Sequence, residues 1–491
     1  MAESVEAVAR ADVLGPVDYL MHKGEANPRT RSGIMALELL DTTPDWERFR
    51  TRFDNASRRV LRLRQKVVVP TLPTASPRWV VDPDFNLDFH VRRVRVSEPG
   101  SLREVFDLAE LLLQSPMDIS RPLWTATLVE GLADGRAATL LHVSHAVTDG
   151  VGSVEMFAEI YDLERDPAPR PTPPLPIPED LTANDLMRQG FNRLPLAIVG
   201  GVLGALSGAV SAAGRVVLEP ASTVSGIVNY ALSGVRVINR AAEPSPLLRR
   251  RSLATRTEAI DIPLADLHRA AKAGGGSIND AYLAGVCGAL RRYHEALGVP
   301  VSTLPMAVPV NLRAEADTTG GNQFTSVNLA APVGTTDPVS RMQKIRAQMT
   351  QRRDEPAMNI IGSLAPVLSI LPTPVLEGIT GTVIGSDVQA SNVPVYPGDT
   401  YIAGAKILRQ YGIGPLPGVA MMVVLISRGG WCTITARSDR AAVRDEALFA
   451  QCLLEGFNEI LALAGDPAPQ AVPASFAAKP ARSASRSASS S

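Results

Sequence analysis

The order of hydrophobic and polar positions predicts a protein of mixed helices and strands. Residues 136–145 (RAATLLHVSH) form an apolar run of strand length, and residues 151–163 then place apolar side chains at helical spacing. The end of residues 79–96 alternates apolar and charged side chains, which is typical of a half-exposed strand. From about residue 252 a second mixed region begins, with a strand, a short helix, a glycine turn and a long helix closed by Gly298.

Two of these helices carry a recognisable N-terminal signal. Ser101 precedes a run of helical spacing and is followed three residues later by Glu104, which predicts a capped amphipathic helix over residues 101–116. Ser277 and Asp280 repeat this arrangement at the start of the long helix in the second region. Both pairs therefore predict capping boxes.

Length and local composition divide the chain into four parts. Its 491 residues exceed what one core supports, since a single core seldom grows past roughly 250–300 residues. Residues 164–180 are too rich in proline for a helix or sheet and predict an extended linker. We therefore expect an N-terminal half over residues 1–163, a connecting region over 164–251, a C-terminal half over 252–464 and a disordered Ala/Ser/Pro tail over 465–491.

The connecting region contains the most apolar stretch of the chain. Residues 194–214 (LPLAIVGGVLGALSGAVSAAG) reach the roughly 20 residues of a membrane-spanning helix, but their many glycines, alanines and serines favour an interfacial or buried helix instead. The region ends in Arg249, Arg250 and Arg251, which could meet phosphate groups or anionic lipid, or form a solvated turn.

Charge and cysteine content narrow the class of protein. Lys and Arg number 49 against 50 for Asp and Glu, so the chain has no overall basic field and nucleic acid is not an expected partner. Cys287, Cys432 and Cys452 are scattered and form no CxxC pair, which fits reduced thiols packed in a core. The first 15 residues contain acidic side chains and no apolar run, so we expect a cytoplasmic protein.

The strongest chemical candidate lies in residues 142–150, HVSHAVTDG. His145 is followed by Asp149 and Gly150, and a histidine with a near-neutral pKa at such a turn suits a general base acting on a hydroxyl. The spacing alone favours a loop histidine beside a helix-capping aspartate, so the surrounding sequence has to decide. If the strand stays regular through His145, His142 and Ser144 lie on its opposite face, so the two imidazoles cannot share a zinc ion and we expect no metal site.

Other catalytic patterns are missing or have a structural explanation. No serine has glycine at both flanking positions of a G-x-S-x-G elbow, and neither a P-loop nor a dinucleotide-binding glycine pattern occurs. Asn279 is not needed for the cap formed by Ser277 and Asp280, and its amide at a helix N-terminus could donate to a developing oxyanion.

Several blocks, in this order, resemble the bacterial wax ester synthase/acyl-CoA:diacylglycerol acyltransferase family, which belongs to the superfamily of CoA-dependent acyltransferases and condensation domains. The resemblance extends from about residue 14 to residue 463. SHAVTDG resembles the family motif HHxxxDG, with Ser144 in place of the first histidine. The other matching residues are Pro122, Leu123 and Trp124 of a PLW segment, Asn279 and Asp280 of SIND, Arg313 of VPVNLR, and Asn392 and Pro394 of SNVP.

The resemblance implies an α/β fold of the α+β sandwich type, with two chloramphenicol-acetyltransferase-like domains and an active-site tunnel between them. It implies that His145 takes the proton of an acceptor alcohol, which then attacks the acyl-CoA thioester directly. Asp149 would hold the turn, Ser144 and Gly150 would support the motif, and Asn279 with Asp280 would bind substrate or the oxyanion. Acyl-CoA would be a co-substrate, and no further cofactor or metal is implied.

The implied product is triacylglycerol from diacylglycerol, or a wax ester from a long-chain alcohol. Because these acceptors are insoluble, the resemblance also implies peripheral association with the inner membrane or with lipid droplets, and residues 194–214 suit such a surface. Two alternatives stay open. Ser144 could mark an inactive homologue that only binds lipid or acyl-CoA, or the enzyme could use a different acceptor alcohol.

Overall fold

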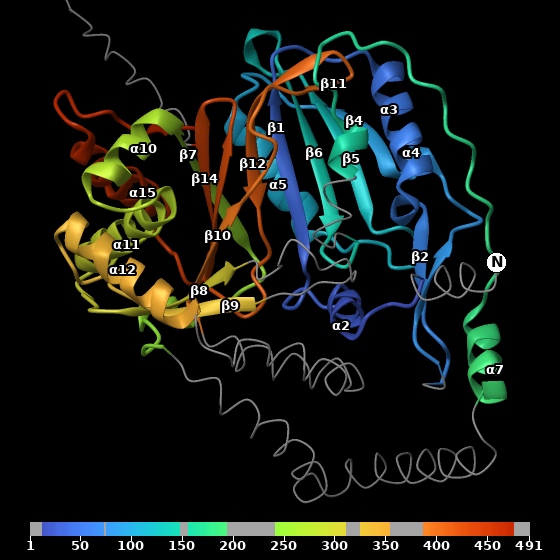
Figure 1. Cartoon of the computed structure of the whole chain (residues 1–491), viewed down its shortest axis with the longest axis horizontal. Coiled ribbons are helices and arrows are strands. Elements are labelled where there is room, and N and C mark those ends of the chain that lie inside the picture. The colour runs from blue at the N-terminus through green and yellow to red at the C-terminus, as the bar shows by residue number, and fades with distance from the viewer. Residues whose placement is uncertain are drawn as a thin grey trace, which may run out of the picture.

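The computed structural model describes residues 12–72, 75–147, 156–193, 241–310, 325–353 and 386–475. Within these ranges it contains sheets of six and seven strands and a separate two-stranded ribbon of β2 (Gln65–Val68) and β3 (Arg78–Val81). The two large sheets lie side by side, with helices to either side of the pair (Figure 1). The predicted mixture of helices and strands is confirmed.

The first sheet combines strands from both ends of the chain, in the order β11-β12-β1-β6-β5-β4. Its strands are β1 (Gly33–Leu40), β4 (Val91–Arg95), β5 (Trp124–Glu130), β6 (Ala137–Ser144), β11 (Tyr401–Ile402) and β12 (Ala405–Ile413). β1 is antiparallel to both of its neighbours, with Gly33 opposite Ser144 and Met35 opposite Ile413. Because β11 and β12 come from the C-terminal half, the division between the sheets does not follow the halves expected from composition.

The second sheet has the order β15-β7-β14-β13-β10-β8-β9. Its strands are β7 (Thr255–Pro263), β8 (Leu304–Val310), β9 (Thr325–Ala331), β10 (Val388–Val393), β13 (Met421–Arg428), β14 (Trp431–Asp439) and β15 (Val472–Pro473). β13 and β14 form an antiparallel hairpin around Gly429 and Gly430, both of which have the positive φ that glycine adopts without steric cost.

Four helices cover one face of the second sheet, α10 (Leu264–Ala273), α11 (Ile278–Ala296), α12 (Pro338–Arg353) and α15 (Glu446–Leu461) (Figure 1). α11 and α15 pack closely because glycines lie at their contact: a Cβ on Gly456 would lie 2.4 Å from the amide nitrogen of Ala289. In the described ranges one helix, Glu446–Ala464, is long and apolar enough to cross a membrane. Its apolar side chains, among them Phe449 and Phe457, are buried in the core of this layer.

One helix, α5 (Leu102–Gln114), packs between the two sheets (Figure 1). Its apolar side chains Val105, Phe106, Ala109 and Leu113 are buried against Leu37 and Leu140 of the first sheet and Ala259 of the second. The helical spacing of these positions in the sequence thus corresponds to a face that both sheets share.

Further helices are α2 (Pro16–Gly24), α3 (Trp46–Arg59), α4 (Leu87–His90) and α7 (Ala183–Arg193), and residues 156–160 are also helical. Short 3-10 turns lie at Leu61–Leu63, Ala133–Gly135, Leu247–Arg249 and Ala462–Ala464.

Both predicted capping boxes are confirmed. The backbone N–H of Ser101 donates to Oε2 of Glu104 at 2.6 Å. At the start of α11, the N–H of Ser277 donates to Oδ2 of Asp280 at 2.8 Å, and the N–H of Asp280 donates to Oγ of Ser277 at 3.2 Å. Asp280, one of the candidate site residues, therefore has a structural role at a helix end.

The connecting region and the tail are described in part. Residues 164–182 contain no helix or strand, and residues 194–214 lie outside the described part of the chain. The prediction of disorder throughout residues 465–491 is wrong for its first part, because Val472 pairs with Asp261 of β7 and the buried Ser475 donates to Glu258 at 2.8 Å. The edge of β7 offers backbone partners to this segment, which local composition cannot reveal.

Candidate active site

The candidate motif lies at the end of β6, where the strand is hydrogen-bonded on both sides. Ser144, its last residue, lies opposite Gly33 of β1, and its N–H donates to the carbonyl of Leu123 at 3.0 Å. Val143 lies opposite Trp124 of β5. The structure thus brings the PLW segment directly beside the motif strand.

Buried aromatic packing fixes the PLW segment in place. The indole N–H of Trp124 donates to the carbonyl of Leu63 at 2.7 Å, and the Trp124 ring stacks on His90 with 4.7 Å between centroids. Pro122, Leu123 and Trp124 are all buried. These contacts give the three residues a structural role, holding the strand next to β6.

The strand ends one residue before His145, so alternation applies only as far as Ser144. Leu141 and Val143 face the core of the first sheet, whereas His142, between them, lines a cavity. His145 lies in the turn that follows, where its backbone N–H donates to the carbonyl of Ser32 at 3.3 Å. Its position is therefore set by this turn and not by the strand register that the sequence analysis assumed.

Ser144 is part of a buried polar cluster. Its Oγ donates to Oε1 of Glu25 at 2.7 Å, and the same carboxylate oxygen accepts from Oγ of Ser32 at 2.8 Å and from the Ser32 N–H at 3.3 Å. Glu25 is only 1% exposed, and burial raises the pKa of its carboxyl, while these hydrogen bonds oppose the rise. Since the Ser32 carbonyl in turn holds the N–H of His145, the cluster connects Ser144 to the turn of the motif.

Glu25 and Ser32 carry no signal in the sequence that marks them as part of the site. Both precede β1 and lie more than 100 residues before Ser144, in a segment that matches no catalytic or binding pattern. Only the antiparallel pairing of β1 with β6 brings them to the motif.

The imidazole of His145 is partly buried. Burial lowers its pKa because it disfavours the charged form, and an interaction with the residue's own backbone carbonyl opposes this shift. The side chain is neutral near pH 7, as a general base requires.

The described contacts do not bring Asn279 and Asp280 to this turn. Both are in the first turn of α11, where the nearby Tyr282 donates its hydroxyl to the carbonyl of Val423 in β13 at 2.9 Å. The next residue of β13, Val424, faces the other way, toward Gly412 of β12. The second sheet therefore separates α11 from the first sheet, and a role for these two residues in catalysis stays a prediction that their placement does not support.

The remaining candidates are either distant or outside the described ranges. Asn392 and Pro394 are exposed at the end of β10, paired through Asn392 with Leu425 of β13. Asp149, Gly150 and Arg313 lie outside the described residues, so their expected roles stay predictions.

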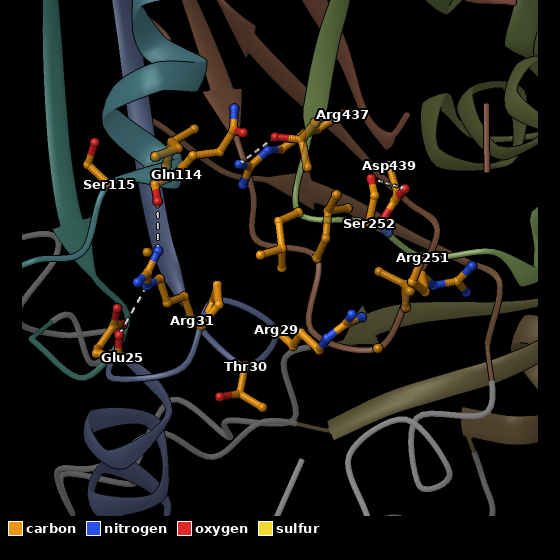
Figure 2. A pocket seen from close by; sticks show the side chains of 18 of the residues that line it. Glu25, Arg29, Thr30, Arg31, Gln114, Ser115, Arg251, Ser252, Arg437 and Asp439 are labelled. Carbon is orange, nitrogen blue, oxygen red and sulfur yellow. Dashed lines mark hydrogen bonds between the residues drawn. The ribbon is translucent and has the colours of Figure 1, made fainter. Parts of the chain in front are cut away.

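A cavity of about 810 Å³ lies where the two sheets meet, beside the Ser144 cluster (Figure 2). Glu25 and His142 belong to its lining. The other lining residues come from several segments that lie far apart in the sequence. Its cationic residues are Arg29, Arg31, Arg249, Arg251 and Arg437. Of these, Arg249 and Arg251 belong to the run of three arginines whose charge predicts possible contacts with phosphate groups.

His142 is a very weak base. It is 5% exposed, and burial lowers its pKa to about 3, with further lowering by the positive charges of Arg437 and Arg31. Its ring lies against the backbone of Gly33, where a Cβ would be 2.7 Å from Nε2. His142 therefore stays neutral at any physiological pH and offers the cavity an uncharged polar wall.

Comparison with known families and proteins gives consistent results. Residues 9–282 match the model of the wax ester synthase/diacylglycerol acyltransferase catalytic domain, and residues 320–461 match the C-terminal domain of the same family. Over 489 residues, covering 100% of both chains, the chain is 83% identical to a protein of Mycobacterium tuberculosis strain H37Rv that is provisionally named a diacylglycerol O-acyltransferase.

Solved structures show the same fold at low sequence identity. A wax ester synthase/diacylglycerol acyltransferase from Marinobacter aquaeolei VT8 is similar with a TM-score of 0.63 and 20% identity, over 92% of this chain and 100% of that one. A trichothecene 15-O-acetyltransferase from Fusarium sporotrichioides has a TM-score of 0.56 at 10% identity, over 91% and 95% of the two chains. The expected two-domain fold is thereby confirmed.

Proposed function

Since the chain belongs to the wax ester synthase/diacylglycerol acyltransferase family, it is an acyltransferase, and we propose that it transfers a long-chain acyl group from acyl-CoA to the free hydroxyl of diacylglycerol. The observation that carries this proposal is the seating of His145. Its turn is held by the Ser32 carbonyl, and its imidazole is neutral near pH 7. Acyl-CoA is the donor, and the reaction needs no other cofactor.

The proposed reaction is a direct displacement. The imidazole of His145 takes the proton of the acceptor hydroxyl as the hydroxyl oxygen bonds to the thioester carbonyl carbon. The tetrahedral intermediate then expels the CoA sulfur by breaking the carbon–sulfur bond, and the protonated imidazole returns the proton to that sulfur. The products are triacylglycerol and CoA with a free thiol, and His145 is neutral again.

A covalent acyl-cysteine route has little chemical support. Cys287, Cys432 and Cys452 are all buried. Burial raises the pKa of Cys287 to about 12 and that of Cys452 to about 11, and it also raises the pKa of Cys432. A thiol nucleophile acts as the thiolate, which these environments disfavour.

The test is a product assay with the purified full chain. Radiolabelled palmitoyl-CoA and phosphatidylcholine vesicles that contain diacylglycerol should yield labelled triacylglycerol, and His145→Ala should lose at least about a hundredfold in rate, the contribution typical of a general base. His268→Ala is the matched control, because His268 is exposed on α10. Product formation by His145→Ala at the rate of the His268→Ala control contradicts the mechanism.

The same assay separates the alternatives for acceptor and activity. Hexadecanol in place of diacylglycerol tests wax ester synthesis. Binding of acyl-CoA without turnover on either acceptor would instead identify a homologue that only binds its ligand. The contacts of Ser144 favour an active enzyme, because this residue takes part in holding the motif turn.

We also propose that the protein associates peripherally with the inner membrane or with lipid droplets. The acceptors are insoluble, and the sequence contains the apolar residues 194–214. The full chain should float with vesicles in a density gradient, and a chain lacking residues 194–214 should float less. Equal flotation of the two would contradict a role for this stretch.

A further inference from the structure

The cavity beside the Ser144 cluster has an excess of positive charge. Five arginines line it, whereas its carboxylates are Glu25 and Asp439. Both carboxylates are already engaged by protein donors: Glu25 accepts from Ser32 and Ser144, and Asp439 accepts from the N–H of Ser252 at 2.6 Å and from its Oγ at 2.8 Å. Arg437 is already paired with Glu110, which lies outside the lining, at 3.2 Å, so four arginines stand against the two lining acids.

The arginines come from separate chain segments and lie at different depths. Arg29 and Arg249 are exposed, Arg31 and Arg251 are partly buried, and Arg437 is buried. Figure 2 shows Arg29, Arg31, Arg251 and Arg437 around the same hollow. Three chain segments, before β1, before β7 and at the end of β14, thus direct cations to one space, unlike a run of charges along a single solvated turn.

Some of these guanidinium groups are held in fixed positions by backbone oxygens. Arg31 donates from Nη1 to the carbonyl of Gln114 at 2.7 Å and from Nε to the carbonyl of Glu25 at 3.1 Å. Arg251 donates from Nη1 to the carbonyl of Arg250 at 3.0 Å. Carbonyl oxygens orient a guanidinium group without neutralising its charge. The carboxylates that act on these two arginines are Glu25 for Arg31, and Asp387 and Asp439 for Arg251.

We propose that this cavity binds the phosphate groups of the acyl donor, the 3′-phosphate and pyrophosphate of acyl-CoA. This inference rests on the proposed function, because the donor carries phosphates whereas diacylglycerol carries none. Arginine forks match phosphate oxygens with two parallel hydrogen bonds, and a volume of about 810 Å³ lies in the range of pockets that hold a ligand of cofactor size.

The position of the cavity relative to the motif suits this assignment. Glu25 lies in its wall and hydrogen-bonds Ser144, the residue next to His145, and His142 in the same wall is uncharged. Apolar residues, including Leu113, Met117 and Val419, also line it. A donor with its phosphates at the arginines can therefore extend its uncharged pantetheine arm along an apolar and neutral wall toward the end of β6.

Binding of CoA itself tests the assignment without requiring acyl transfer. Titration calorimetry of the full chain should give a dissociation constant that rises about tenfold for Arg251→Gln and for Arg249→Gln, since each removes a charge-assisted hydrogen bond. Arg250→Gln is the matched control: it is exposed, lies between the two in sequence and does not line the cavity. Wild-type affinity for dephospho-CoA and for pantetheine should be lower than for CoA, in that order.

The readouts also separate this inference from the proposed function. In the acyl-transfer assay, Arg249→Gln should raise KM for palmitoyl-CoA while leaving kcat and KM for diacylglycerol near wild type. Tighter binding of CoA than of pantetheine, lost in the cavity variants, supports the inference even if triacylglycerol synthesis fails. CoA affinity equal in Arg249→Gln, Arg251→Gln and the Arg250→Gln control overturns it even if synthesis is observed.

Anionic lipid is the other source of phosphate chemistry at this site. Co-sedimentation with phosphatidylglycerol and phosphatidylcholine vesicles distinguishes it. If Arg249→Gln and Arg251→Gln lose binding to phosphatidylglycerol vesicles but keep wild-type affinity for CoA, the cavity binds lipid headgroups and the donor assignment is overturned. Unchanged vesicle binding with weakened CoA binding supports it. Thermal unfolding midpoints equal to that of Arg250→Gln establish that the variants are folded.

Discussion

At the scale of single residues, the serine of the motif connects the catalytic turn to a buried acid. Ser144 has no exposed surface, and its Oγ donates to Glu25, whose other donors come from Ser32. The Ser32 carbonyl accepts from the N–H of His145. A hydroxyl at this position thus helps to fix the loop against which the histidine turn is built, a role that does not require a second imidazole.

Replacing this serine should weaken both the fold and the turn. Ser144→Ala removes one of the hydrogen bonds to a buried carboxyl, so we expect the free energy of unfolding to fall by about 1–3 kcal/mol and the rate of acyl transfer to fall modestly. Urea unfolding and the triacylglycerol assay measure the two effects.

Ser120→Ala provides the comparison, because Ser120 also donates to a carboxylate, Asp118 at 2.6 Å, but in an exposed position. There the loss should be below about 0.5 kcal/mol. Equal destabilisation by the two substitutions would show that the buried hydrogen bond stabilises the fold no more than the exposed one.

At the scale of elements, α5 connects the two halves through a buried charge. Glu110 accepts hydrogen bonds from Thr255 and Thr257 of β7 and pairs with Arg437 of β14 at 3.2 Å. Glu110→Ala leaves the Arg437 guanidinium buried without its partner, which should lower the free energy of unfolding by about 3–5 kcal/mol. Chemical unfolding of the full chain measures this loss.

The control for Glu110 lies on the same helix. Asp107 pairs with Arg103 at 2.8 Å, but its side chain is 55% exposed, so Asp107→Ala should cost less than about 1 kcal/mol. The double variant Glu110→Ala/Arg437→Ala should lose less than the sum of its two single variants. Strictly additive losses would mean that the pair is not coupled.

The elements themselves were predictable where their signals are local. The capping boxes at Ser101 and Ser277 and the strand that ends at Ser144 follow from residues close together in sequence. The strands that pair with β12 and β15 cannot be predicted from nearby residues, because an alternating or short apolar segment can pair with any open strand edge. That is why residues 405–413 in the first sheet, and the pairing of Val472 with β7, appear only in the folded chain.

The candidate site divides in the same way. His145 could be chosen from its motif, and Arg249 and Arg251 could be suspected from their charge. Glu25, by contrast, becomes part of the site only because strands distant in sequence pair and bring it to Ser144. Asn279 shows the reverse case, a residue that the sequence favours and the structure does not. Its place at a helix start suits an oxyanion, but α11 and the motif lie on opposite sides of the second sheet.

At the scale of the whole molecule, the buried histidines make stability depend on pH. The chain has six histidines, and burial lowers the pKa of five: to about 4 for His22 and His90, to about 3 for His142, and below the usual value for His145 and His294. A histidine whose folded pKa is depressed takes up a proton in the unfolded chain first. Its contribution is therefore present above about pH 6.5 and is lost as the pH falls toward the folded pKa.

Buried acids oppose this trend in part. Burial raises the pKa of Glu25, Glu38 and Asp261, so these groups take up a proton in the folded chain first and their protonation favours folding as the pH falls. Three acids stand against five histidines, and the histidine contributions begin to be lost as the pH falls to the unfolded histidine pKa of about 6.5. We therefore expect net loss of stability between about pH 6.5 and pH 5.

His142 provides the sharpest test of this balance. Urea unfolding of the wild type at a series of pH values should show a free energy that falls with decreasing pH, and His142→Gln should reduce the slope by up to about 1.4 kcal/mol per pH unit, which corresponds to one proton. The slope isolates the proton from the packing cost of the substitution, because that cost lowers the free energy equally at every pH. His268→Gln, at an exposed histidine, is the matched control substitution. An unchanged slope in His142→Gln would mean that His142 titrates alike in the folded and unfolded chains, against its burial beside Arg31 and Arg437.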